Sequence, residues 1–408
     1  MLTRDLLRQL QAPEGARALE AAAAALEGER DFLRATQIVA RRFPDRLARA
    51  AVEQVGLRYR AAAKFPAAAA MFFEREALEQ ATSEPVARHR ARRFAGGSIV
   101  FDLGAGIGGD SLALARIAPV TAIERDPIRI ALLQANAGAA GLIDRLRPIQ
   151  ADLLRLPLRF PAGALAFADP GRRAQGRRLR GVQRYEPPLR VVQGWLPALA
   201  GLAVKVSPAV KREELRGLDC EIEFVSLAGE LKEATLWFGA LRAGARRATV
   251  LPAGASIEGE VEADVPTGPL GRFLLEPDPA VLRAGLVRTV AAQLGAHPIA
   301  PEIAFLSQDE IRPSPFVRAY RVLDVAPFRQ KSLQEMLVAR GAGRVTIKRR
   351  GSAVEPEALA RRLRLRGEGE ATVVLTRIAG RQTMLLVEPV AADPASPEAH
   401  VAGAPPVL

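Results

Sequence analysis

Apolar and polar positions follow two different patterns along this chain, and the change falls near Gly96. Over residues 1–92, apolar residues recur at helical spacing among alanine, glutamate and arginine, and glycine is scarce. This spacing predicts an all-helical N-terminal domain. Pro85 is expected to begin its last helix, because proline is tolerated in the first helical turn.

After Gly96 the apolar residues form short runs that alternate with amphipathic stretches, which is the pattern of parallel strands joined by helices. The last two runs, at 220–227 and 232–239, are separated by a short turn and predict an antiparallel hairpin at the sheet edge. We therefore expect an α/β domain over residues 93–240 with a mostly parallel sheet. Its other strands are predicted at 98–103, 120–124, 145–150, 164–168 and 202–207.

The rest of the chain divides into three parts. Residues 241–312 predict a β-rich addendum and a connecting helix at 277–295, which begins at proline and ends at glycine. Residues 313–390 predict an α+β domain with the order β-α-β-α-β-β, whose second helix is expected at 356–366. Residues 391–408 are rich in proline and alanine and predict a disordered tail.

Composition narrows the class of protein. With 49% apolar and 25% charged residues among 408, the chain is an ordinary globular protein and not a disordered, collagen-like or coiled-coil one. The single cysteine, Cys220, excludes a disulfide framework, and three separated histidines give no metal-site spacing. The chain has no apolar run of about 18 residues and no signal-peptide core at its N-terminus. We expect a cytoplasmic protein with neither a membrane nor a metal partner.

Positive charge is concentrated in two segments. The formal net charge is +13, and residues 171–190 and 340–366 carry net charges of +6 and +7, which is the whole surplus. Clustered guanidinium groups attract phosphates, although a solvated face and an arginine-rich genome are the ordinary explanations for such runs. The residues expected to contact nucleic acid are Arg172, Arg173, Arg177, Arg178, Lys348, Arg349, Arg350, Arg361 and Arg362.

The segment DLGAGIGGD at 102–110 carries the main chemical signal. It follows a predicted strand and opens a predicted helix, where glycines let the backbone turn sharply and let a ligand approach it closely. Its glycines fit both the phosphate loop of NAD-binding folds and the DxGxGxG loop of S-adenosylmethionine-binding folds. Asp102 favours the second, because a carboxylate repels a pyrophosphate but can serve the cationic aminopropyl end of S-adenosylmethionine.

Carboxylates also stand at the ends of the next predicted strands. Glu124 is placed to accept hydrogen bonds from two ribose hydroxyls, and Asp152 to bind an adenine amino group. The succession DLGAGIGGD, AIERDP, QADLL and ADPGRR resembles the class I S-adenosylmethionine-dependent methyltransferases. The resemblance covers about residues 95–240 and implies a Rossmann-like fold. It implies a cofactor site formed by Asp102, Gly104, Gly106, Gly108, Glu124 and Asp152.

Asp169 and Pro170 end the fourth predicted strand, where a methyl acceptor would meet the cofactor. With Gly171 and Arg172 they resemble the Asp/Asn-Pro-Pro-aromatic motif of base methyltransferases, but glycine replaces the second proline and arginine replaces the aromatic residue. A guanidinium plane can also stack on a base. We expect Asp169 to orient the acceptor or take its proton, and a simple strand-ending turn is the alternative. Weaker candidates are Tyr185, Glu186 and Lys205.

Residues 313–390 are similar to the THUMP-like domain found behind bacterial methyltransferases of this kind, and LRYRAAAKF, ALEQAT and EPDPAVLRAGL match connecting segments of the same family. The resemblance implies structured RNA as the partner. The expected function is therefore S-adenosylmethionine-dependent methylation of structured RNA. Two alternatives stay open: an RNA-binding protein that has lost catalysis, which Arg172 motivates, and a methyltransferase for a protein or a small molecule.

Overall fold

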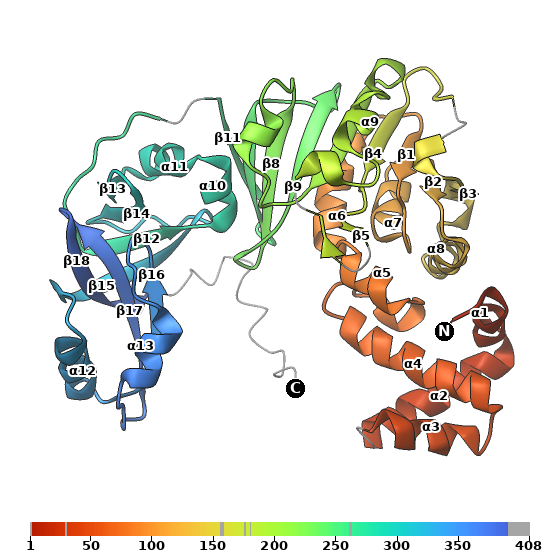
Figure 1. The fold of residues 1–408 in the computed structure, drawn as a ribbon, viewed down its shortest axis with the longest axis horizontal. Helices are drawn as coiled ribbons and strands as arrows, with labels where there is room; N and C mark the ends of the chain where they lie inside the picture. The colour runs from red at the N-terminus through yellow and green to blue at the C-terminus, as the bar shows by residue number, and fades with distance from the viewer. Residues whose placement is uncertain are drawn as a thin grey trace. The chain divides into compact units, whose positions relative to one another are not determined.

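The computed structural model describes residues 2–28, 31–155, 159–174, 177–179, 181–260 and 263–390. The chain forms two compact units, which are Met1–Glu221 with Ala234–Ala243 and Ile222–Glu233 with Gly244–Leu408. Figure 1 labels their helices and strands.

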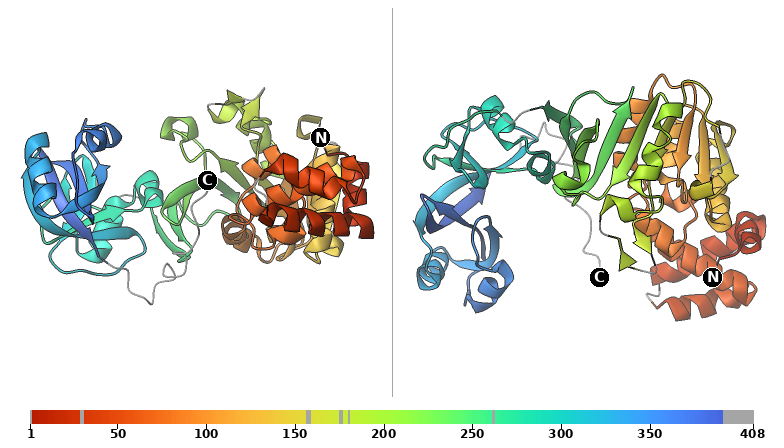
Figure 2. Two further views of the ribbon diagram at one scale, coloured as in Figure 1. Left: turned by 90° about the horizontal axis from the view of Figure 1, so that it is seen from below. Right: turned by 45° about the horizontal axis from the view of Figure 1, so that its top comes forward.

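The first unit begins with helices, as the apolar spacing predicts. Thr3 caps the first of them, since its hydroxyl accepts a hydrogen bond from the Leu6 backbone N–H at 3.3 Å, and Pro85 lies in the first turn of the last. Figure 2 shows them as one group of helices. The helices are α1 (Arg4–Gln11), α2 (Pro13–Gly28), α3 (Phe32–Ala40), α4 (Asp45–Ala61), α5 (Arg75–Gln80) and α6 (Glu84–Ala91).

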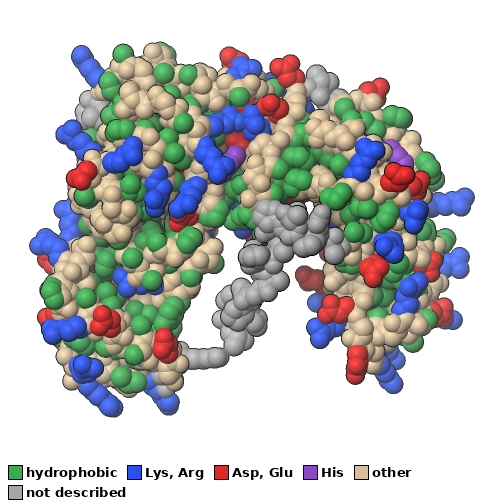
Figure 3. Space-filling model, turned by 180° about the vertical axis from the view of Figure 1, so that it is seen from behind, with side chains coloured by type: hydrophobic (Ala, Val, Ile, Leu, Met, Phe, Trp, Pro, Cys, Tyr) green, Lys and Arg blue, Asp and Glu red, His purple; other side chains and the backbone are tan. Residues whose placement is uncertain are grey.

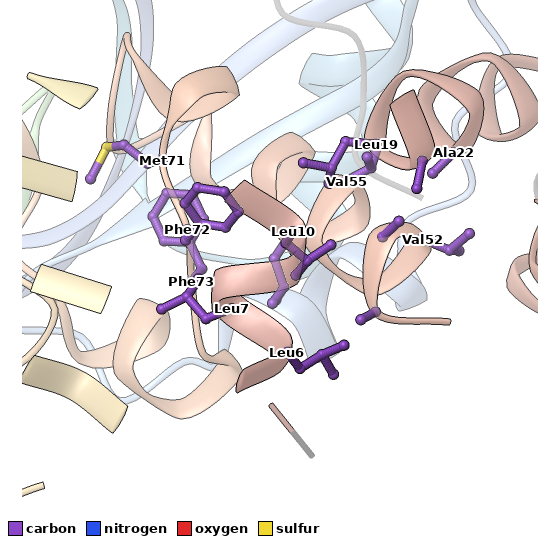
Figure 4. Close-up of a cluster of buried hydrophobic side chains, with 14 of the residues drawn as sticks. Leu6, Leu7, Leu10, Leu19, Ala22, Val52, Val55, Met71, Phe72 and Phe73 are labelled. Atoms are coloured by element: carbon purple, nitrogen blue, oxygen red, sulfur yellow. The ribbon is translucent and has the colours of Figure 1, made fainter. Parts of the chain in front are cut away.

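These helices do not stand apart from the α/β domain that follows. Their buried side chains, some of which are drawn in Figure 4, form one hydrophobic core with Ile107, Leu132 and Ala135 of that domain. Asn136 joins the same interface through hydrogen bonds with the backbone N–H and carbonyl of Phe72, at 2.8 and 3.1 Å. The helical segment therefore forms a packed wall against the α/β domain.

The α/β domain is built on a sheet with the strand order β11-β10-β8-β9-β7-β4-β1-β2-β3. Strands β1 to β4 and β7 are parallel, and β9 is antiparallel to β7. This confirms the expected mostly parallel sheet, and it brings the carboxyl ends of β1 to β4 to one edge. The elements are β1 (Val100–Leu103), α7 (Gly109–Ala115), β2 (Val120–Glu124), α8 (Pro127–Ala139), β3 (Leu146–Gln150), β4 (Leu165–Ala168), β5 (Arg173–Ala174), β6 (Arg177–Arg178), α9 (Leu189–Gln193), β7 (Gly201–Val206), β8 (Glu221–Leu227) and β9 (Glu230–Gly239).

The segment predicted as an addendum is divided between two sheets. Strands β10 (Arg246–Leu251) and β11 (Ala255–Gly259) extend the first sheet beyond β8, so the predicted hairpin is not its edge. Three further strands belong to the second sheet, whose order is β13-β14-β12-β15-β18-β17-β16 and in which only β16 and β17 pair in parallel. Its strands are β12 (Phe273–Pro277), β13 (His297–Ala300), β14 (Ile303–Gln308), β15 (Val317–Pro327), β16 (Ala342–Arg349), β17 (Gly369–Ile378) and β18 (Arg381–Pro389).

Two predicted helices differ from those observed. The helix expected at 277–295 is two helices, α10 (Pro279–Ala284) and α11 (Val287–Leu294), because Gly285 adopts a left-handed conformation with φ of 69° and ends the first. The helix expected at 356–366 is α13 (Pro356–Arg362), which ends early because Leu363 has extended backbone. Helix α12 (Gln330–Ala339) packs with α13 over one face of the second sheet. The tail predicted at 391–408 lies outside the described residues.

Candidate active site

The glycine loop between β1 and α7 adopts a conformation that its sequence dictates. Gly104, Gly106 and Gly108 have φ of 95°, 55° and 95°, values that residues with a Cβ rarely adopt. A Cβ on Gly104 would lie 3.0 Å from the carbonyl oxygen of Asp169, so glycine is also required by the close approach of the fourth strand end. The loop is held to β2, since the N–H groups of Gly104 and Ala105 donate to the Ile123 carbonyl at 2.9 and 3.0 Å.

Glu124 fixes the same loop from the end of β2. One of its carboxylate oxygens accepts a hydrogen bond from the Gly106 N–H, and the other accepts one from the Asp126 N–H, both at 2.9 Å. Each carboxylate oxygen has a further lone pair that can accept a hydroxyl proton. Asp152 follows β3, is exposed, and accepts a hydrogen bond from the Leu154 N–H at 3.0 Å.

Asp102 lies beneath the loop and is fully buried. Its Oδ2 accepts a hydrogen bond from the Ser111 hydroxyl at 2.5 Å, and its Oδ1 has no partner. Burial, reinforced by the nearby charge of Asp110, raises the pKa of Asp102 to about 8. A buried oxygen without a hydrogen bond costs free energy of folding. A cationic ligand bound near the loop would offset this cost. Asp102 itself does not line the cavity.

Asp169 follows β4 and is connected to a chain of buried polar groups. Its Oδ2 lies 2.6 Å from the Lys205 ammonium nitrogen, which comes from β7. Lys205 also donates to the Thr82 hydroxyl at 2.8 Å, and Thr82 donates to Asp110 at 2.9 Å. Asp110 is in turn paired with the buried guanidinium of Arg90. Sequence reasoning ranked Lys205 low and gave no role to Thr82 or Arg90, because their segments carry no strand-end pattern.

One cavity of about 860 Å³ joins these strand ends. Most of the residues predicted to bind the cofactor or the acceptor line it, while Asp102 and Gly108 do not. A second wall comes from helix α5 and the residues that follow it, which sequence reasoning did not connect with the site. Of the weaker candidates, Glu186 lines the cavity and Tyr185 is buried, with its hydroxyl accepting from the Ser207 N–H at 3.2 Å. The predicted residues in the lining are Gly104, Gly106, Glu124, Asp152, Asp169, Pro170 and Arg172.

A larger cavity of about 1220 Å³ lies among α1, α2, α4 and α8. Leu7, Leu10, Leu19, Val55 and Phe72, all labelled in Figure 4, contribute to its wall. It is lined mainly by apolar residues and contains none of the predicted strand-end residues, so its size does not make it the site of the chemistry.

The predicted phosphate-binding residues fall into different environments. Lys348 lies 2.5 Å from Glu276, and Arg349 lies 2.7 Å from Glu355. Arg350 donates to the Ala304 carbonyl at 2.6 Å and stacks over an aromatic ring. These three groups therefore bind within their own unit. Arg361 and Arg362 are exposed and form no ion pair with a described residue.

The other predicted phosphate-binding residues belong to the first unit. Arg172 lines the cavity, and Arg173, Arg177 and Arg178 belong to the short strands β5 and β6, with side chains outside the described part of the structure. Figure 3 shows lysine and arginine side chains spread over the face in view. Among the described residues, no group of three or more histidine, cysteine or acidic side chains could hold a metal ion. No described helix has both the length and the apolar composition to cross a membrane.

Comparison with known proteins decides the family. The chain is 39% identical over 316 residues to uncharacterised S-adenosylmethionine-dependent methyltransferases from two strains of Mycobacterium tuberculosis, an alignment that covers 75% of this chain and 84% of each relative. The chain belongs to the S-adenosylmethionine-dependent methyltransferases. This enzyme thus has the cofactor that the order of its strand-end motifs implies.

Two further comparisons cover other parts of the methyltransferase. Residues 317–389 match the family model described as THUMP domain-like, and residues 3–61 match a domain of unknown function, DUF8688. The fold is similar to the crystal structure of a candidate methyltransferase from Porphyromonas gingivalis W83, with a TM-score of 0.75 at 22% identity, over 92% of this chain and 99% of that one. The similarity in fold includes the second unit as well as the cofactor domain.

The site's own groups suit the cofactor. Bound S-adenosylmethionine supplies an electrophilic methyl group on a sulfonium. The protein therefore has to bind the cofactor, orient the acceptor and accept the proton that the acceptor loses. The glycine loop offers backbone that a ligand can approach closely, Glu124 offers hydrogen-bond acceptors for hydroxyls, and Asp102 offers a buried carboxyl oxygen without a hydrogen bond beneath the loop. Asp169 stands at the adjoining strand end with one oxygen held by Lys205.

Proposed function

We propose that this methyltransferase modifies structured RNA and that Asp169 and Pro170 bind the acceptor. The observation that carries the proposal is the single cavity in which the glycine loop, Glu124 and the Asp169-Pro170 strand end meet. An acceptor atom held at Asp169 would lie next to a cofactor held by the loop, and such positioning accounts for most of the catalysis that methyl transfer requires.

Three features support RNA as the acceptor. The similarity to THUMP domains covers residues 317–389. Arg361 and Arg362 of that unit are exposed and available for phosphates. Arg172 lines the cofactor cavity, where its planar guanidinium could stack on a base.

Mass spectrometry of nucleosides tests the proposal. RNA from cells that lack the gene should lose one methylated nucleoside, and the gene should restore it while its Asp169→Ala variant should not. Purified Asp169→Ala protein should still bind S-adenosylhomocysteine in calorimetry, which separates loss of acceptor binding from loss of folding. An unchanged set of RNA nucleosides, together with transfer of labelled methyl groups into the protein or small-molecule fraction of a cell extract, would refute RNA as the acceptor.

A further inference from the structure

Lys205 is the nearest cation to the acceptor carboxylate among the described residues. Its side chain is only 4% exposed, and its ammonium donates to both Asp169 and Thr82, at 2.6 and 2.8 Å. Thr82 belongs to the N-terminal helical segment and is one of the residues that line the cavity. The lysine therefore ties the acceptor strand end to the helical wall.

Charge balance explains why a lysine stands there. The carboxyl groups of Asp110 and Asp169 both act on Asp102 through space, so three acidic groups share a small buried region. Two cations, Lys205 and Arg90, face them from β7 and α6. An ammonium buried without a counter-charge would be strongly disfavoured, and the carboxylates of Asp110 and Asp169 would be equally disfavoured without their cations. Lys205 and Asp169 therefore form a charge-assisted hydrogen bond in this buried region.

We infer that Lys205 is a positioning residue that holds Asp169 through its Oδ2, so that Oδ1 is left to receive a proton from the methyl acceptor. Oδ1 has no hydrogen-bond partner among the described residues, and Asp169 lines the cavity. This inference rests on the proposed role of Asp169 and narrows the substrate class. The accepting atom carries a hydrogen, as in an amino N–H or a hydroxyl O–H, and it is neutral before the transfer.

The charges of the cavity wall support a neutral acceptor. Among the described residues in the lining, seven are acidic and only three are basic. Two of these three arginines already face a carboxylate, since Arg129 lies 3.3 Å from Glu74 and Arg125 lies 3.8 Å from Glu186. An anionic acceptor such as a carboxylate or phosphate oxygen would be repelled at this point, whereas a neutral group that donates a hydrogen bond would be attracted to Asp169.

The proposed methyl transfer balances in atoms and electrons without a further reagent. A lone pair of the acceptor nitrogen or oxygen forms a bond to the methyl carbon, while the bond from that carbon to sulfur breaks and its electron pair remains on sulfur. The sulfonium becomes a neutral thioether. The hydrogen of the acceptor leaves as a proton to Oδ1 of Asp169. Asp169 releases this proton to water before the next cycle.

The test replaces Lys205 by methionine, which keeps the length of the side chain and removes its charge. Transfer of labelled methyl groups into extract from cells that lack the gene should show kcat reduced by about 100-fold, with KM for the cofactor unchanged. The acidic limb of the pH–rate profile should move to higher pH, because Asp169 would lose its own cation while the carboxyl groups of Asp102 and Asp110 remain nearby, with only Arg90 facing them. Lys205→Arg should restore kcat to within about tenfold of the wild type.

A matched control is Lys232→Met, since Lys232 also pairs at 2.6 Å, with Glu230, but is partly exposed and does not line the cavity. It should leave kcat and the pH profile unchanged. Binding of S-adenosylhomocysteine reports whether Lys205→Met is folded. If that variant does not fold, Thr82→Val removes one partner of the ammonium and should reduce kcat about fivefold, again with a shifted acidic limb.

The outcomes separate this inference from the choice of RNA. A methylated nitrogen or oxygen in the protein or small-molecule fraction would refute RNA and leave the role of Lys205 intact. A methyl group found on carbon, sulfur or a carboxylate would overturn the inference, and so would a folded Lys205→Met enzyme with the wild-type pH profile.

Discussion

The acidic strand ends of the first unit and the basic run at 348–350 in the second unit are both dense in charge, yet their charges face different surroundings. Glu124, Asp152 and Asp169 line one cavity. The three basic side chains of the run face carboxylates, a carbonyl and aromatic rings of their own unit. Charge density in a sequence therefore identifies a site only where the fold leaves the charged groups facing open space.

Geometry explains the difference. A residue at the end of a parallel strand has its backbone fixed by the sheet, so its place at the common edge follows from the strand order. A long basic side chain on a strand can reach several neighbours, and its partner depends on distant residues. Lys348 meets Glu276, which is 72 positions earlier in the chain.

The largest expected effect is on Glu124. Glu124→Ala removes the acceptor for the Gly106 N–H and the carboxylate proposed to bind the ribose hydroxyls. Affinity for S-adenosylhomocysteine should fall at least about 100-fold, because each lost hydrogen bond to a charged group costs about 1.5–3 kcal/mol. Isothermal titration calorimetry measures this, and Glu230→Ala, at an exposed carboxylate, is the control. Wild-type affinity in Glu124→Ala would show that the carboxylate only shapes the loop.

The sequence predicted the cofactor domain well because its evidence is local. Strand ends, glycines with positive φ and the residues after each strand follow from short-range pattern and a parallel sheet. The wall formed by α5 and the Lys205–Thr82 contact were not predictable in this way, because they join residues 123 positions apart. The splitting of the helix at 277–295 was within reach, since Gly285 lies in its middle.

A second prediction tests the buried carboxyl group of Asp102. Burial raises the pKa of Asp102 to about 8, whereas an unfolded chain has an ordinary value near 4. Between these values the unfolded state releases a proton that the folded state retains, so the free energy of unfolding falls as pH rises. Asp102→Asn, which keeps an acceptor for Ser111, should match the wild type below pH 4 and be more stable by several kcal/mol at pH 8.

Urea denaturation of the cofactor-free protein at pH 4, 6 and 8 measures this difference. Ser111→Ala is the accompanying variant, because it removes the hydrogen bond at 2.5 Å and leaves the carboxyl group in place. Above pH 8, where Asp102 is mostly ionised, Asp102→Asn should also bind S-adenosylmethionine less tightly than the wild type, since the cation loses a nearby negative charge. If Asp102→Asn were equally destabilised at all three pH values, stability would not be linked to the proton of Asp102, and the role of this residue would be purely steric.

The smallest expected effect separates exposed arginines from enclosed ones. Replacing Arg361 and Arg362 by alanine should leave the free energy of unfolding within about 0.5 kcal/mol, because neither residue pairs with a described side chain. RNA affinity should fall about fivefold at 0.1 M salt, and the slope of log K against log salt should decrease by about 1–2.

Arg350→Ala is the matched control: its guanidinium lies 4.9 Å from the Phe305 ring centre, so its loss should cost about 1–2 kcal/mol of stability without changing the salt slope. If Arg350→Ala instead reduced the slope as much as the double variant, the enclosed group would contact phosphate, and the contrast between the two environments would not govern binding.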